Sequence, residues 1–119
     1  MIKIQWEIYK GKELCILDYR NTSVDEIKIV VQDVTTQVLQ SSKKDICFLV
    51  NLEGLNGNKE ILETFKVEGK KTEDVTKKTA VLGITGIKKV LFTAYNRFTG
   101  GKSRIFSSGE EAKDWLLSS

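Results

Sequence analysis

The sequence predicts an α/β fold with a mixed, mainly parallel central sheet of about five strands and helices packed against it. Strand-like and helix-like hydrophobic patterns alternate along the 119 residues in the order β-β-α-β-α-β-α-β-α. Two strand-like runs, residues 14–17 and 46–50, are apolar at consecutive positions, which is typical of strands covered on both faces. The length suits a single domain over residues 1–119.

The first 19 residues predict a β-hairpin. Residues 2–8 alternate apolar and polar side chains, as expected of an edge strand with one wet face. A short turn at residues 10–12 connects them to residues 13–19, which contain the first apolar run. The hairpin therefore places one strand at an edge and one in the interior of the sheet.

A helix is predicted after residue 23. Ser23 and Glu26 form a capping box, in which each side chain can satisfy a free backbone amide. Apolar residues then recur at steps of three and four as far as residues 41–44. These residues are Ile27, Val31, Val34 and Val38.

The middle of the chain predicts a strand, a loop, a helix and a further strand. Residues 45–52 read as a central parallel strand and residues 53–58 as a loop. The second helix begins near Asn58 and fades in the polar residues 67–78. The fourth strand is predicted at residues 79–85.

The last part of the chain predicts two helices around a short strand at residues 103–106. The third helix ends at Gly100 and Gly101, and the last one begins at Ser107 or Ser108, with Trp115 and Leu116 facing inward. The core stripe of the third helix is predicted to be Ile87, Val90, Leu91, Ala94 and Phe98.

The end of the chain carries a set of motifs: TKKTAVLGITGIKKVLFTAYNRFTG at residues 76–100, SRIF at 103–106 and EEAKDWL at 110–116. With them the chain resembles the SpoIIAA-like family of small STAS-type domains. In that family a basic pair precedes a V-x-G-[ILV]-T-G strand end, and a helix closing on F-T-G follows. The resemblance is close over residues 76–117 and lies only in the pattern over residues 1–75. It implies a fold related to the lipid-binding CRAL/TRIO domains.

The resemblance also implies a regulator that acts through a serine or threonine in the loop after a central strand, phosphorylated by a partner kinase. The corresponding loop, residues 51–57, contains no hydroxyl side chain. We therefore carry over the fold and not the phosphorylation switch, because function must be argued from a site.

The composition excludes several kinds of chemistry. The chain has no histidine, which removes Ser-His and Cys-His nucleophile activation and the commonest zinc ligand. Cys15 and Cys47 lie in apolar runs and are interpreted as buried hydrophobic residues, since a cytosolic setting disfavours a disulfide. An enzymatic role would rest on Asp18, Glu53 and Lys78, which show no pairing in sequence.

The hydrophobic runs predict a cytoplasmic protein, with contact at the membrane periphery as an option. Each run is far shorter than the roughly 20 residues of a membrane span. The first ten residues alternate in polarity and do not form the apolar segment of a signal peptide.

Positive charge is concentrated in residues 66–104, which hold ten Lys and Arg against three acids, whereas the rest of the chain has nine against thirteen. This polarisation favours an anionic partner; the alternative is a solvated surface whose basic residues pair with acids elsewhere. Lys88 and Lys89 open the third helix, where the positive end of the helix dipole disfavours them. We therefore expect a compensating negative group.

The turn at Thr85 and Gly86 leaves free backbone amides at the carboxyl edge of the sheet, where an anion could dock. The favoured alternative is that Thr85 is a plain N-cap. Lys88, Phe92 and Tyr95 share one helical stripe, which suits either a contact surface or the core.

The predicted function is a non-enzymatic binding or regulatory module without metal, cofactor or catalytic residue. It engages an anionic lipid surface, or a small apolar ligand with an acidic head, through the basic helix start. The alternative is a STAS-like protein-interaction module with an acidic partner; a homodimer is a further option, and no nucleic-acid motif occurs. The predicted ligand- or partner-binding residues are Asn51, Gly54, Asn56, Thr85, Gly86, Lys88, Lys89, Phe92 and Arg97.

Overall fold

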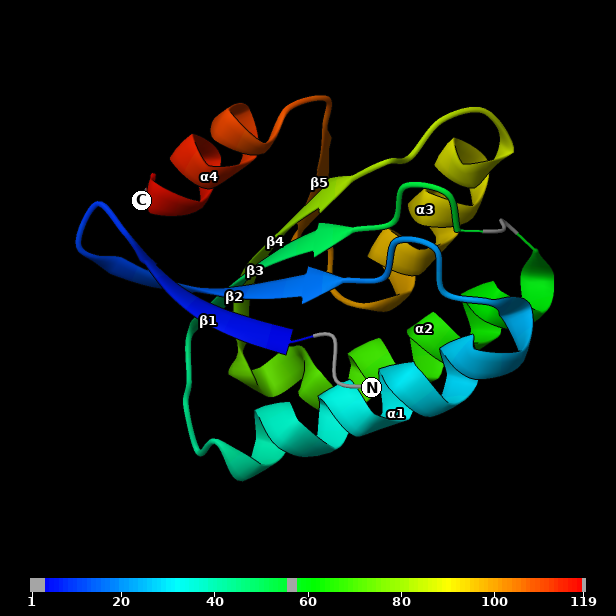
Figure 1. Cartoon of the computed structure of the whole chain (residues 1–119), viewed down its shortest axis with the longest axis horizontal. Coiled ribbons are helices and arrows are strands. Elements are labelled where there is room, and N and C mark those ends of the chain that lie inside the picture. Colours follow the sequence, from blue (N-terminus) through cyan, green and yellow to red (C-terminus); the bar gives the residue numbers. More distant parts are fainter. Residues whose placement is uncertain (1–3, 56–57, 119) are drawn as a thin grey trace.

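The chain folds around a five-stranded sheet, as a computed structural model shows for residues 4–55 and 58–118 (Figure 1). The strands are β1 (Ile4–Tyr9), β2 (Lys12–Asp18), β3 (Ile46–Asn51), β4 (Thr76–Leu82) and β5 (Ser103–Phe106). The helices are α1 (Val24–Gln40), α2 (Lys59–Thr72), α3 (Ile87–Phe98) and α4 (Gly109–Leu117), with a 3-10 turn at Glu73–Val75. The predicted fold class is confirmed.

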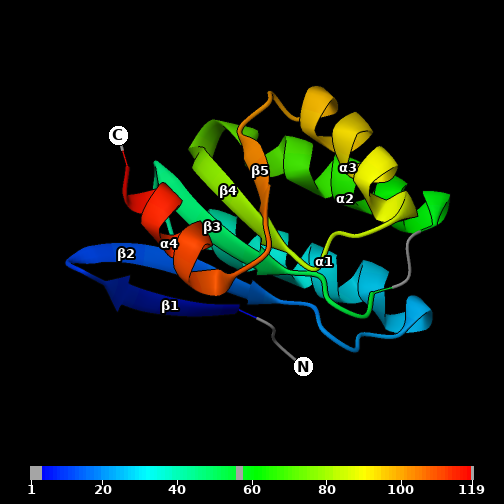
Figure 2. The ribbon, with the colours of Figure 1, turned by 90° about the horizontal axis from the view of Figure 1, so that it is seen from above.

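The order of the strands in the sheet follows their order in the chain, β1-β2-β3-β4-β5. β1 and β2 form the predicted antiparallel hairpin at one edge, and every later pair is parallel. Crossovers of one hand between successive neighbouring strands place their helices on one face of a sheet. Accordingly α1, α2 and α3 cover one face, and α4 covers the other (Figures 1 and 2).

Two apolar cores lie on the two faces of the sheet. The larger core packs α1 against alternate residues of β2 and β3, and it contains all four helical residues predicted from their spacing. The smaller core packs α4 through Ala112 and Leu116 against Leu14, Leu49 and neighbouring residues of the central strands. Because alternate strand residues point to opposite faces, Cys15 lies in the larger core and Cys47 in the smaller one.

Side-chain caps fix three of the helix starts. Ser23 Oγ accepts from the Glu26 amide at 3.2 Å, as the capping box predicts, but Glu26 Oε1 accepts from the Ser23 hydroxyl at 2.8 Å instead of from a backbone amide. Asn58 begins α2 and Ser108 begins α4, each accepting from an amide three residues on, at 2.8 and 3.2 Å. These caps satisfy amides that the first turn of a helix leaves free.

α2 ends at Thr72, within the polar residues 67–78 where the sequence predicts that it fades. Two ion pairs at i,i+3 spacing explain how so polar a segment remains helical. Lys71 Nζ lies 2.9 Å from Glu68 Oε2, and Lys70 Nζ lies 2.9 Å from Glu73 Oε1.

β4 begins and ends three residues earlier than predicted. It spans Thr76–Leu82, so that its first residue pairs with Ile46 of β3. Gly83 follows with φ +85°, a left-handed conformation that ends the extended strand.

α3 is rotated about its axis relative to the prediction. The predicted inward stripe is wrong, because Ile87 and Val90 are each 66% exposed. Leu91 is the one member of that stripe that lines the cavity, and Phe92 and Tyr95 line it beside Leu91. None of the residues of α3 is fully buried. The contact of Tyr95 with α2, described below, fixes this rotation. In the part of the chain that the structure describes, no helix is both long and apolar enough to cross a bilayer.

Candidate functional site

A cavity of about 150 Å³ lies between the sheet and helices α1, α2 and α3. Its lining is mainly apolar and comes from several elements. Phe48, Val50 and Val81 line it from the sheet, Phe65 from α2 and Leu91 from α3. The space is partly open to solvent, so it is a pocket between these elements and not a void sealed within the core.

The cavity exists because the side chains under α3 are short. On the face of β4 and β5 that carries the helices, Thr79 and Ser103 are neighbours in register and both line the cavity. No residue of α3 is fully buried, so no side chain of this helix fills the space above these two residues. A floor of small hydroxyl side chains below a loosely seated helix therefore leaves the space open.

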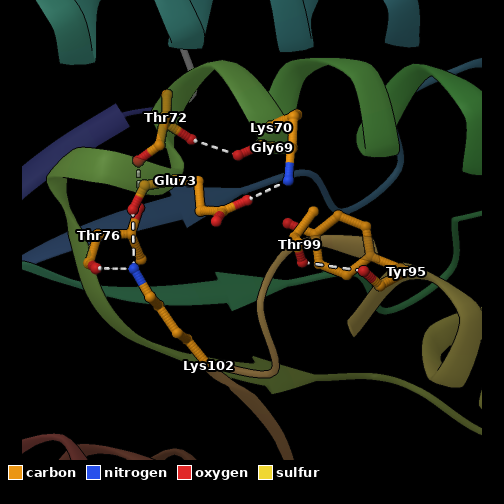
Figure 3. A network of polar contacts seen from close by, with 8 residues as sticks. All are labelled: Gly69, Lys70, Thr72, Glu73, Thr76, Tyr95, Thr99 and Lys102. Carbon is orange, nitrogen blue, oxygen red and sulfur yellow. Dashed lines mark hydrogen bonds and ion pairs between the residues drawn. The ribbon is translucent and has the colours of Figure 1, made fainter. Parts of the chain in front are cut away.

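Gly69 sets the distance between α2 and α3. A Cβ at this position would lie 2.8 Å from the Tyr95 hydroxyl oxygen and 3.2 Å from Cγ2 of Thr99, so a larger residue would push the helices apart. The Thr99 hydroxyl donates to the Tyr95 carbonyl at 2.9 Å (Figure 3). Glycine inside a helix costs about 1 kcal/mol relative to alanine, and this close approach explains its presence.

Lys102 closes the same end of the cavity. Its ammonium donates to the carbonyl oxygens of Glu73 and Thr76, both at 2.9 Å (Figure 3). The buried Oε1 of Glu73 lies 2.9 Å from Lys70 Nζ, an ion pair that lacks the alignment of a hydrogen bond. Lys102 is thus engaged in holding the start of β4 to the end of α2.

Polar groups also line the interior of the cavity, among them Tyr19 and Glu68. The Tyr19 ring is buried and packs edge-to-face on Phe65, with ring centroids 5.4 Å apart. Burial raises the pKa of Tyr19 far above its ordinary value, and the nearby Tyr95, Cys15 and Glu68 add to that shift. Burial likewise raises the pKa of Tyr95, against a hydrogen bond with Thr99 that lowers it. Both phenols therefore keep their protons at neutral pH.

The structure separates the two lysines that open α3. Lys88 turns inward and lines the cavity, and its ammonium donates to the Gly83 carbonyl at 3.1 Å and approaches that of Leu52 at 3.5 Å. Lys89 is exposed. For Lys88, the expected negative group is therefore supplied by backbone carbonyls that follow β3 and β4.

The predicted N-cap at Thr85 is wrong. Gly86 is the N-cap of α3, and no side chain bonds to the free amides of this first turn. Gly86 has φ +59°, which turns the chain into the helix one residue after Thr85 and leaves the Thr85 side chain exposed.

The remaining predicted site residues divide between the cavity and the surface. Phe92 lines the cavity together with Lys88. Asn51 ends β3, and its side chain accepts from the Glu53 amide at 3.0 Å, which shapes the following loop. Gly54, Thr85, Gly86, Lys89 and Arg97 are exposed, and Asn56 lies outside the described residues.

The three acid-base candidates do not form one site. Lys78 lies against α4, where its ammonium donates to the Trp115 carbonyl at 3.0 Å, whereas Asp18 ends β2 and pairs with Arg20 at 2.8 Å. Among residues 4–55 and 58–118, no three His, Cys, Asp or Glu side chains come together in a way that could hold a metal ion.

Sequence reasoning missed Tyr19, Glu68, Gly69 and Thr79. Two signals could have found them. Gly69 stands inside a helical segment, and Thr79 opens an apolar run on a central strand. A glycine or a hydroxyl in such a place indicates a close approach or a gap that a larger apolar residue would remove.

The sheet is sequential and mainly parallel, with three crossover helices on one face and α4 on the other (Figure 2). The structure is similar to a crystal structure of an uncharacterized protein from the DUF3478 family of Shewanella loihica PV-4, which is described as having a SpoIIAA-like fold. The TM-score is 0.69 at 18% sequence identity, over 96% of this chain and 92% of that one. No protein-family model matches the chain, and no curated protein matches it significantly. The predicted resemblance is confirmed at the level of the fold.

Proposed function

We propose that this protein is a non-enzymatic binding module that holds a small apolar ligand in the cavity between the sheet and helices α1, α2 and α3. The cavity itself carries the proposal, because it has a volume of about 150 Å³ and a mainly apolar lining. An engineered apolar cavity of about 150 Å³ stays dry and binds benzene or xenon. The cavity therefore suits one ring or a short chain.

Lys88 is the residue that would meet an acidic head on such a ligand. It lines the cavity next to the ends of β3 and β4. An ammonium has three protons, and the bonds to Gly83 and Leu52 use at most two of them. This position supports a role for Lys88 in ligand binding, with its ammonium acting inside the cavity.

Filling the cavity is expected to abolish binding. Leu91→Trp places an indole in the cavity, whereas Val90→Trp adds the same side chain on the outer face of α3, where Val90 is 66% exposed. In an NMR titration with toluene, we expect the wild type and Val90→Trp to show amide shifts at cavity-lining residues. Leu91→Trp should lose at least about tenfold in affinity. Equal binding by the two variants, or no binding by the wild type, would contradict the proposal.

The outer face of α3 supports a second function, contact with an anionic lipid surface. Ile87 and Val90 are each 66% exposed on this face, and Lys89 and Arg97 are exposed nearby. Apolar side chains flanked by basic ones are typical of helices that lie in the headgroup layer. Lys88 has no part in this surface, because its ammonium is turned toward Gly83.

The two neighbouring lysines provide a matched test of this second function. We expect co-sedimentation with vesicles of phosphatidylserine and phosphatidylcholine, and not with phosphatidylcholine alone, weakening at high salt. Lys89→Gln should reduce vesicle binding about fivefold, since one basic residue near the surface is worth about 1 kcal/mol, and Lys88→Gln should leave it unchanged. If both variants bind like the wild type, or if nothing co-sediments, the lipid function is contradicted. An acidic protein would then be the partner to test on this face.

A further inference from the structure

Most hydrogen-bond donors around the cavity are already used within the fold. Thr35 donates to the carbonyl of Val31 at 3.2 Å and Thr99 to that of Tyr95 at 2.9 Å, each four residues back in the chain. Lys102 is engaged by two carbonyls, as Figure 3 shows. These groups are satisfied and offer little to a ligand.

Two hydroxyls of the lining are not engaged in this way. Tyr19 and Thr79 are 2% and 9% exposed, and both line the cavity. Over residues 4–55 and 58–118, neither hydroxyl bonds to another residue, and neither oxygen is sealed in the core, where the buried side-chain oxygens without a hydrogen bond are Thr22 Oγ1 and Glu73 Oε1. A hydroxyl that is reachable from the cavity and has no protein partner is available to a ligand.

The carboxylate of Glu68, which also lines the cavity, narrows the chemistry of the ligand further. The Glu68 side chain is 6% exposed, and its Oε2 lies 2.9 Å from Lys71 Nζ. An ionised carboxylate only accepts hydrogen bonds, so it favours a ligand group that donates. Because Lys71 already balances the charge, a second cation would lose its hydration without an unpaired anion to meet. A neutral donor fits best.

We propose that the cavity binds a single ring or short chain that carries a neutral hydroxyl or N–H group, and that Tyr19, Thr79 and Glu68 are the polar groups that receive it. The inference rests on the proposed function, since it names the chemistry of the ligand for the same cavity. A plain hydrocarbon would leave all three groups without a new partner, whereas a hydroxyl can donate and accept at once.

Toluene and p-cresol test the inference, because they share a methylated ring and differ in one hydroxyl. We expect isothermal titration of the wild type to give p-cresol an affinity about two- to tenfold higher than that of toluene. Tyr19→Phe and Thr79→Val each remove one hydroxyl at almost constant volume, and should shrink this advantage while toluene binding is retained. Tyr9→Phe is the matched control, because Tyr9 lies outside the cavity lining and bonds to Asp114.

The outcomes separate the inference from the proposed function. Equal affinities for toluene and p-cresol in the wild type would overturn the inference and leave the apolar cavity in place. An advantage of p-cresol that survives in both Tyr19→Phe and Thr79→Val would also overturn it. If neither compound binds the wild type, the proposed function fails and the inference fails with it. Since Tyr19 follows β2 and Thr79 lies in β4, one variant stays informative if the other does not fold.

Discussion

Gly83→Ala is expected to destabilise the protein by at least about 3 kcal/mol, the largest effect of any single substitution considered. Gly83 ends β4 with φ +85°, and a Cβ there would lie 2.6 Å from Glu53 Cα and closer still to the Glu53 backbone nitrogen. These are backbone atoms of the loop after β3, which cannot move aside as a side chain would. Urea unfolding followed by tryptophan fluorescence measures the loss.

Gly11→Ala is the control that separates the two causes. Gly11 has φ +84°, almost the same as Gly83, but nothing lies within 4 Å of the position of its Cβ. We expect it to cost about 1 kcal/mol, the strain of a left-handed residue alone. Equal losses for the two variants would show that the approach of Glu53 to Gly83 is not as close as described.

Leu116→Ala is expected to cost about 2–5 kcal/mol, in the range for large-to-small changes at fully buried sites. Leu116 is 0% exposed and is the larger of the two buried side chains of α4, in the same core cluster as Leu14 and Cys47. Shortening it leaves a void under a nine-residue helix with few other buried side chains. The midpoint of urea unfolding should fall, and Cys47 should react faster with a thiol reagent.

Leu39→Ala provides the comparison for Leu116→Ala. The same atoms are removed, but Leu39 lies at the end of α1 and is 47% exposed. Its free energy of unfolding should change by about 1 kcal/mol or less. If the two variants are equally destabilised, α4 is not held by the packing of Leu116.

Much of the fold could be predicted because its signals are local. The period-two pattern of β1, the apolar runs of β2 and β3, and the caps Ser23 and Asn58 each report on a single element. The exact boundaries have a different origin. The sequence leaves the end of α2 open within residues 67–78 and places β4 three residues too late. The end of α2 is held by ion pairs at i,i+3 spacing and β4 by its register with β3, and neither is visible in a hydrophobic pattern.

The site was harder to predict, because the cavity results from small residues at a few positions, and a hydrophobic pattern does not register them. Its residues line a space left by Thr79 and Ser103 and bounded by the approach of Tyr95 to Gly69. Helical periodicity placed Ile87 and Val90 in the core, although both are exposed. The spacing of apolar residues does not show which face of the helix packs against the neighbouring elements. Of the predicted site residues, Lys88 and Phe92 line the cavity, whereas Lys89 and Arg97 are exposed and lie outside it.

The sequential strand order has a consequence for how the chain is made. Because each strand pairs with the strand before it, synthesis from the N-terminus can extend the sheet one strand at a time, beginning with the β1–β2 hairpin. The α1 face is covered early, since α1 precedes β3. The opposite face waits for α4, the last element in chain order. Until residues 109–117 emerge from the ribosome, Leu14, Cys47 and Leu49 lack their cover, which makes this face the one a chaperone would meet on the nascent chain.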